Sequence, residues 1–172
     1  IWGKVLWYEN EGTKTEPKLK TAQPIKVEWN GTTPKPAWFW WSPEGKELVT
    51  QWRTSPVVVD WNGDGLSDLA MLDTEGFFCL FERARNDDGT GLKLLHPKRI
   101  FKDAGADLRL NQKSAGGSGR RKLCMVDWDG DGKRDLLANT KNIALLRNVT
   151  EEKGAVRFQD MGNLDDRILA GH

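Results

Sequence analysis

The sequence predicts an all-β fold, and three observations lead to that prediction. Apolar residues fall in short blocks or alternate with polar residues, a pattern typical of strands. Gly, Pro, Asn and Asp separate these blocks closely, as they do in turns. A block that contains an aspartate-rich loop also occurs twice, as "VVVDWNGDGLSDLAML" and as "LCMVDWDGDGKRDLLA". A small β unit that recurs along a chain is typical of repeat architectures.

The N-terminal part predicts two strands, at 4–9 ("KVLWYE") and 24–29 ("PIKVEW"), because both are rich in β-branched and aromatic residues. The next two strands, at 55–61 and 68–72, flank the first aspartate-rich loop. Each is short and apolar, and the loop between them holds the glycines that a tight turn requires.

The remaining strands follow the same plan. "GFFCLFER" and "LKLLHPKRIF" are separated by the turn sequence "NDDGTG". "KLCMVDW" and "DLLAN" flank the second aspartate-rich loop, and "IALLRN" and "AVRFQDM" come after it. The strands are therefore expected at 76–83, 92–101, 122–128, 135–139, 143–148 and 155–161.

Alignment of the repeats gives the expected organisation of the chain. "GKVLWYEN", "GFFCLFER" and "NIALLRN" match one another, so the strand after the loop occurs more often than the loop itself. We interpret 1–32 as the end of one repeat, 33–100 as a whole repeat with its loop at 60–68, and 101–172 as another with its loop at 127–135. Each whole repeat is expected to be a four-stranded antiparallel sheet, and such sheets stack as propeller blades. The chain would then form about two and a half blades of a β-propeller.

Composition limits the classes of partner. The 172 residues suffice for one domain with a core, and the formal net charge of +1 argues against a nucleic-acid partner. No apolar run approaches the length of a membrane span. Cys79 and Cys124 lie in apolar runs, where buried free thiols are expected rather than a disulfide.

The two loops carry the pattern of a calcium site. Oxygen-bearing side chains occupy their first, third, fifth and ninth positions, and the residue at the seventh position has a backbone carbonyl free to turn inward. The expected metal ligands are Asp60, Asn62, Asp64, Leu66 and Asp68 in the first loop and Asp127, Asp129, Asp131, Lys133 and Asp135 in the second. Calcium takes several oxygen ligands from a flexible cage, and glycine at the sixth position permits the sharp bend.

Other interpretations of the loops explain less. Zinc prefers His or Cys, which neither loop contains. An EF-hand needs a Glu at its twelfth position, where this chain has Met71 and Ala138. A polar hairpin turn would explain the glycines but not the carboxylates that recur at the first, fifth and ninth positions.

"VDWNGDGLSDLAML" and "VDWDGDGKRDLLAN" resemble the calcium loops of FG-GAP/VCBS repeats, and "GKVLWYENEG" resembles the strand that follows such a loop. The resemblance implies seven-bladed β-propellers of the kind found in integrin α-chains and in secreted bacterial proteins. It also implies bound Ca²⁺ and a secreted, periplasmic or cell-surface location. The segments at 33–52 and 101–121 depart from the family's minimal repeat.

Those two segments are the candidates for ligand binding. In the first, Trp40, Trp41 and Trp52 would offer flat surfaces to sugar rings, with Arg53 beside the last. In the second, Arg120 and Arg121 follow a glycine-rich stretch and could pair with carboxylates or sulfates. Core packing of the tryptophans and a solvated basic loop remain the alternatives.

These observations favour a calcium-binding propeller module that interacts with carbohydrate, with an acidic polysaccharide as the expected ligand. Flanking blades or other copies of the chain would cover its open sheet edges. An adhesion or protein-interaction scaffold is one alternative, and part of a polysaccharide lyase or glycosidase is another. No catalytic residue can be assigned, since His96 lies in a strand-like context and no Ser–His–Asp pattern is legible.

Overall fold

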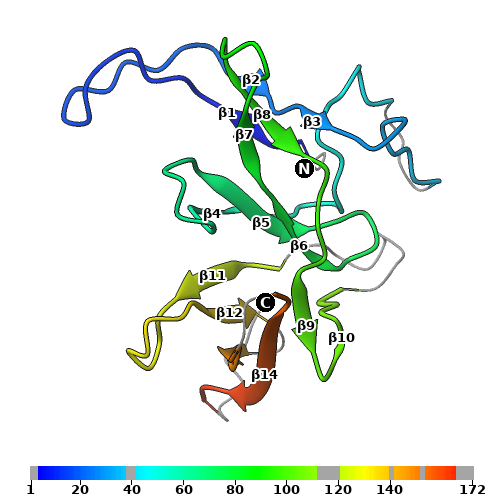
Figure 1. Cartoon of the computed structure of the whole chain (residues 1–172), viewed down its shortest axis with the longest axis vertical. Coiled ribbons are helices and arrows are strands. Elements are labelled where there is room, and N and C mark those ends of the chain that lie inside the picture. The colour runs from blue at the N-terminus through cyan, green and yellow to red at the C-terminus, as the bar shows by residue number, and fades with distance from the viewer. Residues whose placement is uncertain (1–3, 38–41, 112–120, 140–141, 152–153, 166–172) are drawn as a thin grey trace.

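The computed structural model describes residues 4–37, 42–111, 121–139, 142–151 and 154–165. These residues form strands, turns and loops but no helix, so the prediction of an all-β fold is confirmed for the described part of the chain. Figure 1 shows the sheets following one another along the long axis, from the N-terminal strands to the C-terminal sheet.

The largest sheet belongs to the C-terminal repeat and contains six strands in the order β10-β9-β14-β13-β12-β11. Its antiparallel part runs through four successive strands, each paired with the next in the chain. β9 then adds to β14 in parallel. The bounds are β9 Phe101–Asp103, β10 Ala106–Asp107, β11 Leu123–Val126, β12 Asp135–Asn139, β13 Ile143–Asn148 and β14 Val156–Asn163.

The preceding repeat has the same strand succession, divided between two sheets. β4, β5 and β6 form one antiparallel sheet, and β3, β8 and β7 form the other. β8 pairs with β7 in antiparallel fashion and with β3 in parallel, as β14 pairs with β13 and β9. The bounds are β3 Val27–Glu28, β4 Val57–Val59, β5 Asp68–Leu72, β6 Phe78–Phe81, β7 Arg83–Arg85 and β8 Leu92–Leu95.

Three predicted strands are interrupted. The strand expected at 24–29 divides at Ile25 into β2 (Gln23–Pro24) and β3. The strand expected at 76–83 divides at Glu82 into β6 and β7, because the backbone N–H of Arg83 donates to the Asp68 carboxylate and not to a neighbouring strand. The strand expected at 92–101 divides into β8 and β9 around Pro97, whose ring nitrogen has no proton for a sheet hydrogen bond.

The N-terminal strands form a small hairpin. β1 (Leu6–Trp7) pairs with β2 (Gln23–Pro24), and a bridge between Asn10 and Leu19 extends the pairing toward the turn. Beyond it, β3 supplies the parallel strand of the first whole repeat, although it lies before residue 33. The prediction that each whole repeat forms a four-stranded antiparallel sheet is therefore wrong, because each repeat also contains a parallel strand pair. The two strands of each parallel pair are distant in sequence, so no local pattern indicates their pairing.

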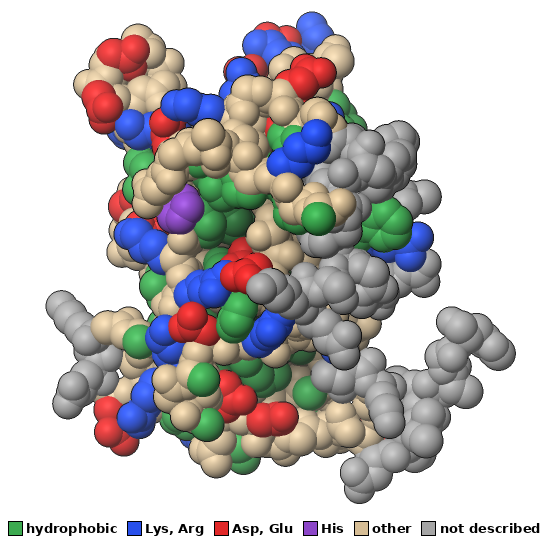
Figure 2. All heavy atoms as spheres, turned by 90° about the vertical axis from the view of Figure 1, so that its right-hand side faces the viewer, with side chains coloured by type: hydrophobic (Ala, Val, Ile, Leu, Met, Phe, Trp, Pro, Cys, Tyr) green, Lys and Arg blue, Asp and Glu red, His purple; other side chains and the backbone are tan. Residues whose placement is uncertain are grey.

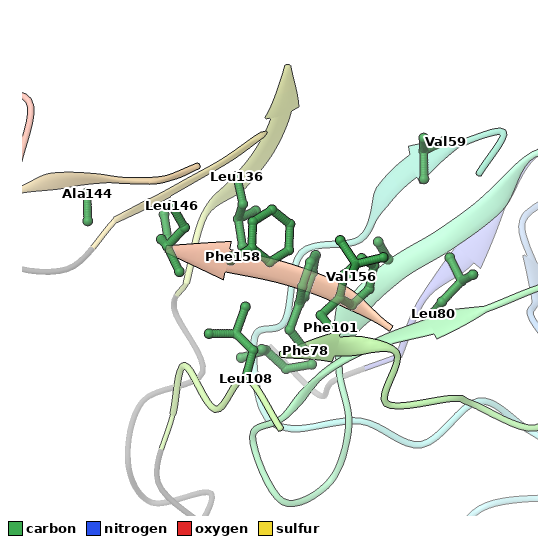
Figure 3. Packing of buried hydrophobic residues seen from close by; sticks show 13 residues of the cluster. Val59, Phe78, Leu80, Phe101, Leu108, Leu136, Ala144, Leu146, Val156 and Phe158 are labelled. Atoms are coloured by element: carbon green, nitrogen blue, oxygen red, sulfur yellow. The ribbon is translucent and has the colours of Figure 1, made fainter. Parts of the chain in front are cut away.

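Side chains of β5 and β6 are buried on both faces of their sheet. One face carries Leu69, Met71, Cys79 and Phe81, which pack with Ile25, Val27, Leu48 and Leu94. The other face packs against the C-terminal repeat through Phe101, Leu136, Leu146 and Phe158. Figure 3 shows these side chains meeting between the two repeats. Hydrophobic contact between successive repeats therefore forms the larger core.

Candidate metal centre

Each aspartate-rich loop joins the first and second antiparallel strands of its repeat. The first loop connects β4 to β5, and the second connects β11 to β12. In both, the ninth loop residue is also the first residue of the following strand, Asp68 or Asp135. The strands therefore hold both ends of each loop.

Within the first loop, side-chain oxygens accept hydrogen bonds from the loop's own backbone. Asp60 accepts from Gly63 through Oδ1 at 2.8 Å and from Gly65 through Oδ2 at 3.0 Å. Asn62 Oδ1 accepts from the N–H of Asp64 at 3.0 Å. Asp64 Oδ1 in turn accepts from the N–H of Leu66 at 2.7 Å. These bonds fold the chain around the side chains at its first, third and fifth positions.

The second loop repeats this set of hydrogen bonds. Asp127 accepts from Gly130 at 2.8 Å and from Gly132 at 3.0 Å. The N–H of Asp131 donates to Asp129 Oδ1 at 3.3 Å. The N–H of Lys133 donates to Asp131 Oδ1 at 2.8 Å, and this bond lowers the pKa of the Asp131 carboxyl. The two sequences therefore adopt the same loop conformation.

Glycine is required at the sixth position of both loops. Gly65 and Gly132 each have a φ of 84°, which lies in the left-handed region that most residues disfavour. In this conformation their N–H groups donate to the aspartate at the first position. The positive φ at the sixth position therefore explains why both loops have glycine there.

The ninth position is the buried member of each site. Asp68 is 0% exposed and Asp135 is 1% exposed. Asp68 accepts from the N–H of Trp61 at 3.0 Å and of Arg83 at 2.7 Å. Asp135 accepts from Trp128 at 3.0 Å and from the N–H of Asn148 at 2.7 Å. One carboxylate thereby connects the start of the loop to a later strand of the repeat, β7 for Asp68 and β13 for Asp135.

Three carboxylates of the second loop converge. Oxygens of Asp127, Asp129 and Asp135 lie within 4.8 Å of one another, so this group could hold a metal ion. Asp135 is buried and carries no ion pair with a described Lys or Arg. A buried carboxylate is costly unless hydrogen bonds and a counter-charge stabilise it. A cation among these oxygens would supply the missing charge.

The two loops differ in the charges around them. In the second, Arg147 pairs with Asp129 at 2.5 Å and Lys133 pairs with Asp131 at 3.5 Å. In the first, Asn62 takes the place of Asp129 and donates from Nδ2 to Asp64 Oδ2 at 2.9 Å. The sequence pattern does not indicate Arg147, because this residue follows the loop by many positions and reaches it only through strand pairing.

At the seventh position, the N–H groups of Leu66 and Lys133 donate to the fifth-position carboxylates. The role of their backbone carbonyls as metal ligands stays a prediction. Arg83 and Asn148 were missed as contributors to the sites. Both act through the backbone N–H, which carries no signature in the amino-acid sequence. For Arg147, the only sequence signal is a positive charge that could pair with the negatively charged loop.

Of the predicted ligand-binding residues, Trp40, Trp41 and Arg120 lie outside the described residues. The other three have defined surroundings. The guanidinium of Arg53 lies 6.0 Å from the centre of the Trp52 ring. Arg121 donates to the backbone carbonyls of Leu110 at 3.0 Å and Asn139 at 2.6 Å. Those bonds give Arg121 a structural role, and its contact with a ligand stays a prediction.

A hydrogen bond joins the two segments that contain the predicted ligand-binding residues. The side chain of Asn111 donates to Oε1 of Gln51 at 2.8 Å, and Gln51 is 0% exposed. Trp52 follows Gln51 directly, and Asn111 belongs to the segment that contains the glycine-rich stretch. This hydrogen bond brings Gln51 and Asn111, one residue from each segment, into contact.

The remaining sequence candidates are structural or exposed. His96 accepts a hydrogen bond on Nδ1 from the backbone of Asn30 at 3.2 Å and lies edge-on to Trp29. Cys79 and Cys124 are free thiols, and Cys79 is buried as expected, but Cys124 is exposed. Burial raises the pKa of Cys79, and the neighbouring Asp73 raises it further. Figure 2 shows charged side chains of both signs mixed over one face.

Comparison with protein-family models, with curated proteins and with solved structures finds no match for this chain. Among the described residues no helix is long and apolar enough to cross a membrane.

Proposed function

We propose that this chain is a calcium-binding repeat protein in which each aspartate-rich loop holds one Ca²⁺ ion. The observation that carries the proposal is the repetition of one hydrogen-bonded loop conformation around carboxylates at equivalent positions. A turn that needed only to reverse the chain would not require a buried aspartate at its end. Because both loops adopt this conformation, we infer that each binds the same kind of ligand.

The donor set favours calcium over other cations. All the candidate side-chain ligands are oxygens, from carboxylates and from the Asn62 amide, and calcium takes six to eight oxygen ligands. Zinc would require nitrogen or sulfur ligands, and magnesium keeps more of its water. In this proposal the ion acts structurally. It would neutralise the carboxylates that link each loop to the later strands of its repeat.

Terbium binding would test the proposal. Tb³⁺ occupies calcium sites, and Trp61 and Trp128 at the second loop position are placed to sensitise its emission. We expect Tb³⁺ emission that Ca²⁺ displaces and Mg²⁺ does not, and a higher unfolding midpoint in Ca²⁺ than in chelator. Asp64→Ala and Asp131→Ala should each remove one class of site.

Asp87→Asn provides a matched control, because the Asp87 side chain is 97% exposed and lies outside both loops. Loss of terbium emission in this control would indicate non-specific binding to surface carboxylates. Equal unfolding midpoints in calcium and in chelator would contradict the proposal directly.

The β-propeller arrangement and the location outside the cytoplasm belong to the same proposal. A sheet whose two faces are both buried by neighbouring repeats supports radial stacking of blades. A location where free calcium is high would allow sites of modest affinity to fill. The FG-GAP/VCBS resemblance of the loops supports both points.

An acidic polysaccharide is the ligand that we propose for this module, supported by the contact between Gln51 and Asn111. This contact brings the Trp52–Arg53 pair to the beginning of the Gly/Arg-rich segment. Arg53→Ala should weaken binding of an acidic polysaccharide such as pectate in affinity electrophoresis and leave a neutral glucan unaffected. Equal mobility of wild type and variant in the gel that contains acidic polysaccharide would show that Arg53 does not contact this ligand.

A further inference from the structure

The two repeats can be compared position by position because one buried aspartate begins the second strand of each. Counting from Asp68 and Asp135, the cross-strand pair Ala70–Leu80 corresponds to Leu137–Leu145. The pair Leu72–Phe78 likewise corresponds to Asn139–Ile143. These pairs lie on the same face of their sheets, since side chains alternate along a strand. We call it the C-side face, because in the first whole repeat it meets the C-terminal repeat.

In the first whole repeat the C-side face is completely covered. Ala70, Leu72, Phe78 and Leu80 are all 0% exposed. They pack with Phe101, Leu136, Leu146, Val156 and Phe158 of the following repeat. Trp61 of the first loop joins this contact, with its ring centre 5.2 Å from that of Phe101. The chain thus shows what covers a C-side face, namely another repeat.

The same face of the C-terminal repeat is open. Ile143, the counterpart of Phe78, is 42% exposed. Leu137 and Leu145 are half-buried. Trp128, the counterpart of Trp61, is 51% exposed. No strand among the described residues covers them, so an apolar surface remains where the preceding repeat forms its core.

The opposite end of the chain exposes apolar residues of its own. Val5 packs inward against the cluster around Met71 and Phe81. Alternation along β1 therefore turns Leu6 and Tyr8 away from that cluster. Leu6 is 46% exposed and Tyr8 is 54% exposed. This N-terminal surface lies on the side from which a preceding repeat would approach.

We propose that a second copy of this chain docks head to tail, with its Leu6–Tyr8 surface against the C-side face of the C-terminal repeat. The contact continues the interface between the two whole repeats, which already joins a C-side face to the unit that follows it. The two surfaces are different, so the contact is heterologous. Repetition of a heterologous contact produces a closed ring or an open filament. The proposal concerns assembly and is independent of calcium binding.

Sedimentation velocity of the full chain at increasing concentration tests this proposal. We expect the wild type to associate as its concentration rises toward about 100 µM, a range that detects weak contacts. Ile143→Glu and Leu6→Glu should each weaken association by about tenfold or more, since each places a charge in an apolar contact. Val58→Glu is the matched control, because Val58 is 64% exposed and lies on neither surface.

A mixture of the two variants distinguishes a head-to-tail contact from other modes of association. Ile143→Glu leaves the Leu6–Tyr8 surface intact, and Leu6→Glu leaves the C-side face intact. Equal amounts of both should form a one-to-one dimer that does not grow further. A wild type that stays monomeric, a mixture that forms no dimer, or an equal effect of Val58→Glu would each overturn the proposal. Circular dichroism of every variant would detect misfolding separately.

Discussion

The carboxylate of Asp135 accepts a hydrogen bond of 2.7 Å from the backbone N–H of Asn148, the last residue of β13. Its other oxygen accepts from the first part of the loop, at Trp128. A single buried side chain therefore joins the aspartate-rich loop to a strand that lies beyond the next turn. Asp68 and Arg83 have the same relationship in the preceding repeat.

Replacement of this carboxylate should destabilise the protein. In Asp135→Asn the shape is retained, but an amide NH₂ would face one of the two N–H donors. We expect a loss of about 2–3 kcal/mol in the free energy of unfolding, the usual cost of an unsatisfied buried polar group. Urea denaturation in chelator measures it. Asp87→Asn should change stability by less than about 0.5 kcal/mol, and equal losses for both variants would contradict the assigned role.

Arg147 should weaken metal binding at the second loop. Its guanidinium pairs with Asp129, one of the three converging carboxylates, so an incoming cation has to compete with it. The second loop has more carboxylates than the first and is expected to fill first. Arg147→Ala should strengthen its calcium affinity by up to about fivefold, because exposed ion pairs contribute about 0–1 kcal/mol.

Calorimetric titration of Arg147→Ala measures that change. Arg157→Ala is the control, since Arg157 is exposed on β14, outside both loops. An unchanged or weaker calcium affinity in Arg147→Ala would show that this arginine does not oppose the ion.

Gly76 should be more sensitive to substitution than other glycines with similar backbone angles. Its φ is 88°, and a Cβ atom would lie 2.4 Å from the carbonyl oxygen of Asn111. Gly105 has a φ of 84° and open space around it. We expect Gly76→Ala to cost about 3 kcal/mol or more and Gly105→Ala about 1 kcal/mol. Similar unfolding midpoints in urea would show that the 108–111 segment moves aside easily.

Cys79 should resist alkylation in the folded protein. Burial and the nearby Asp73 raise the pKa of its thiol, so the reactive thiolate is scarce at pH 8. Cys124 is exposed. Mass spectrometry after brief iodoacetamide treatment should find Cys124 labelled and Cys79 unlabelled, with both labelled in urea. Labelling of Cys79 without denaturant would contradict its burial.

The same pKa shift predicts how stability depends on pH. The folded state holds the Cys79 proton more tightly than the unfolded state, in which the thiol pKa is about 8.5. Its stabilising contribution is therefore complete below that value and decreases as the pH rises above it. Cys79→Ala should show a smaller loss of stability between pH 8 and 10, measured by urea denaturation at each pH. An identical pH dependence in both proteins would exclude this contribution.

The positions of most strands could be predicted from the local sequence pattern, but the parallel pairing between strands could not. The strands on either side of each loop form close to their expected positions, because short apolar blocks between glycine-containing turns favour them. The parallel addition of β3 to β8 and of β9 to β14 was not foreseen. Each joins residues separated by most of a repeat, and hydrogen bonds between backbones are possible for nearly any sequence.

The sequence by itself determined the two loops, because their hydrogen bonds join residues within nine positions and depend on Asp, Asn and Gly at fixed spacing. Only the tertiary structure decided which carboxylates become buried and what lies beside them. Asp135 is enclosed because β13 folds back onto β12, and Arg147 reaches Asp129 from the same strand. Tertiary packing likewise partly buries Trp61 and leaves Trp128 exposed, although both follow the first aspartate of the same motif. Burial depends on the neighbouring repeat, which a local pattern cannot encode.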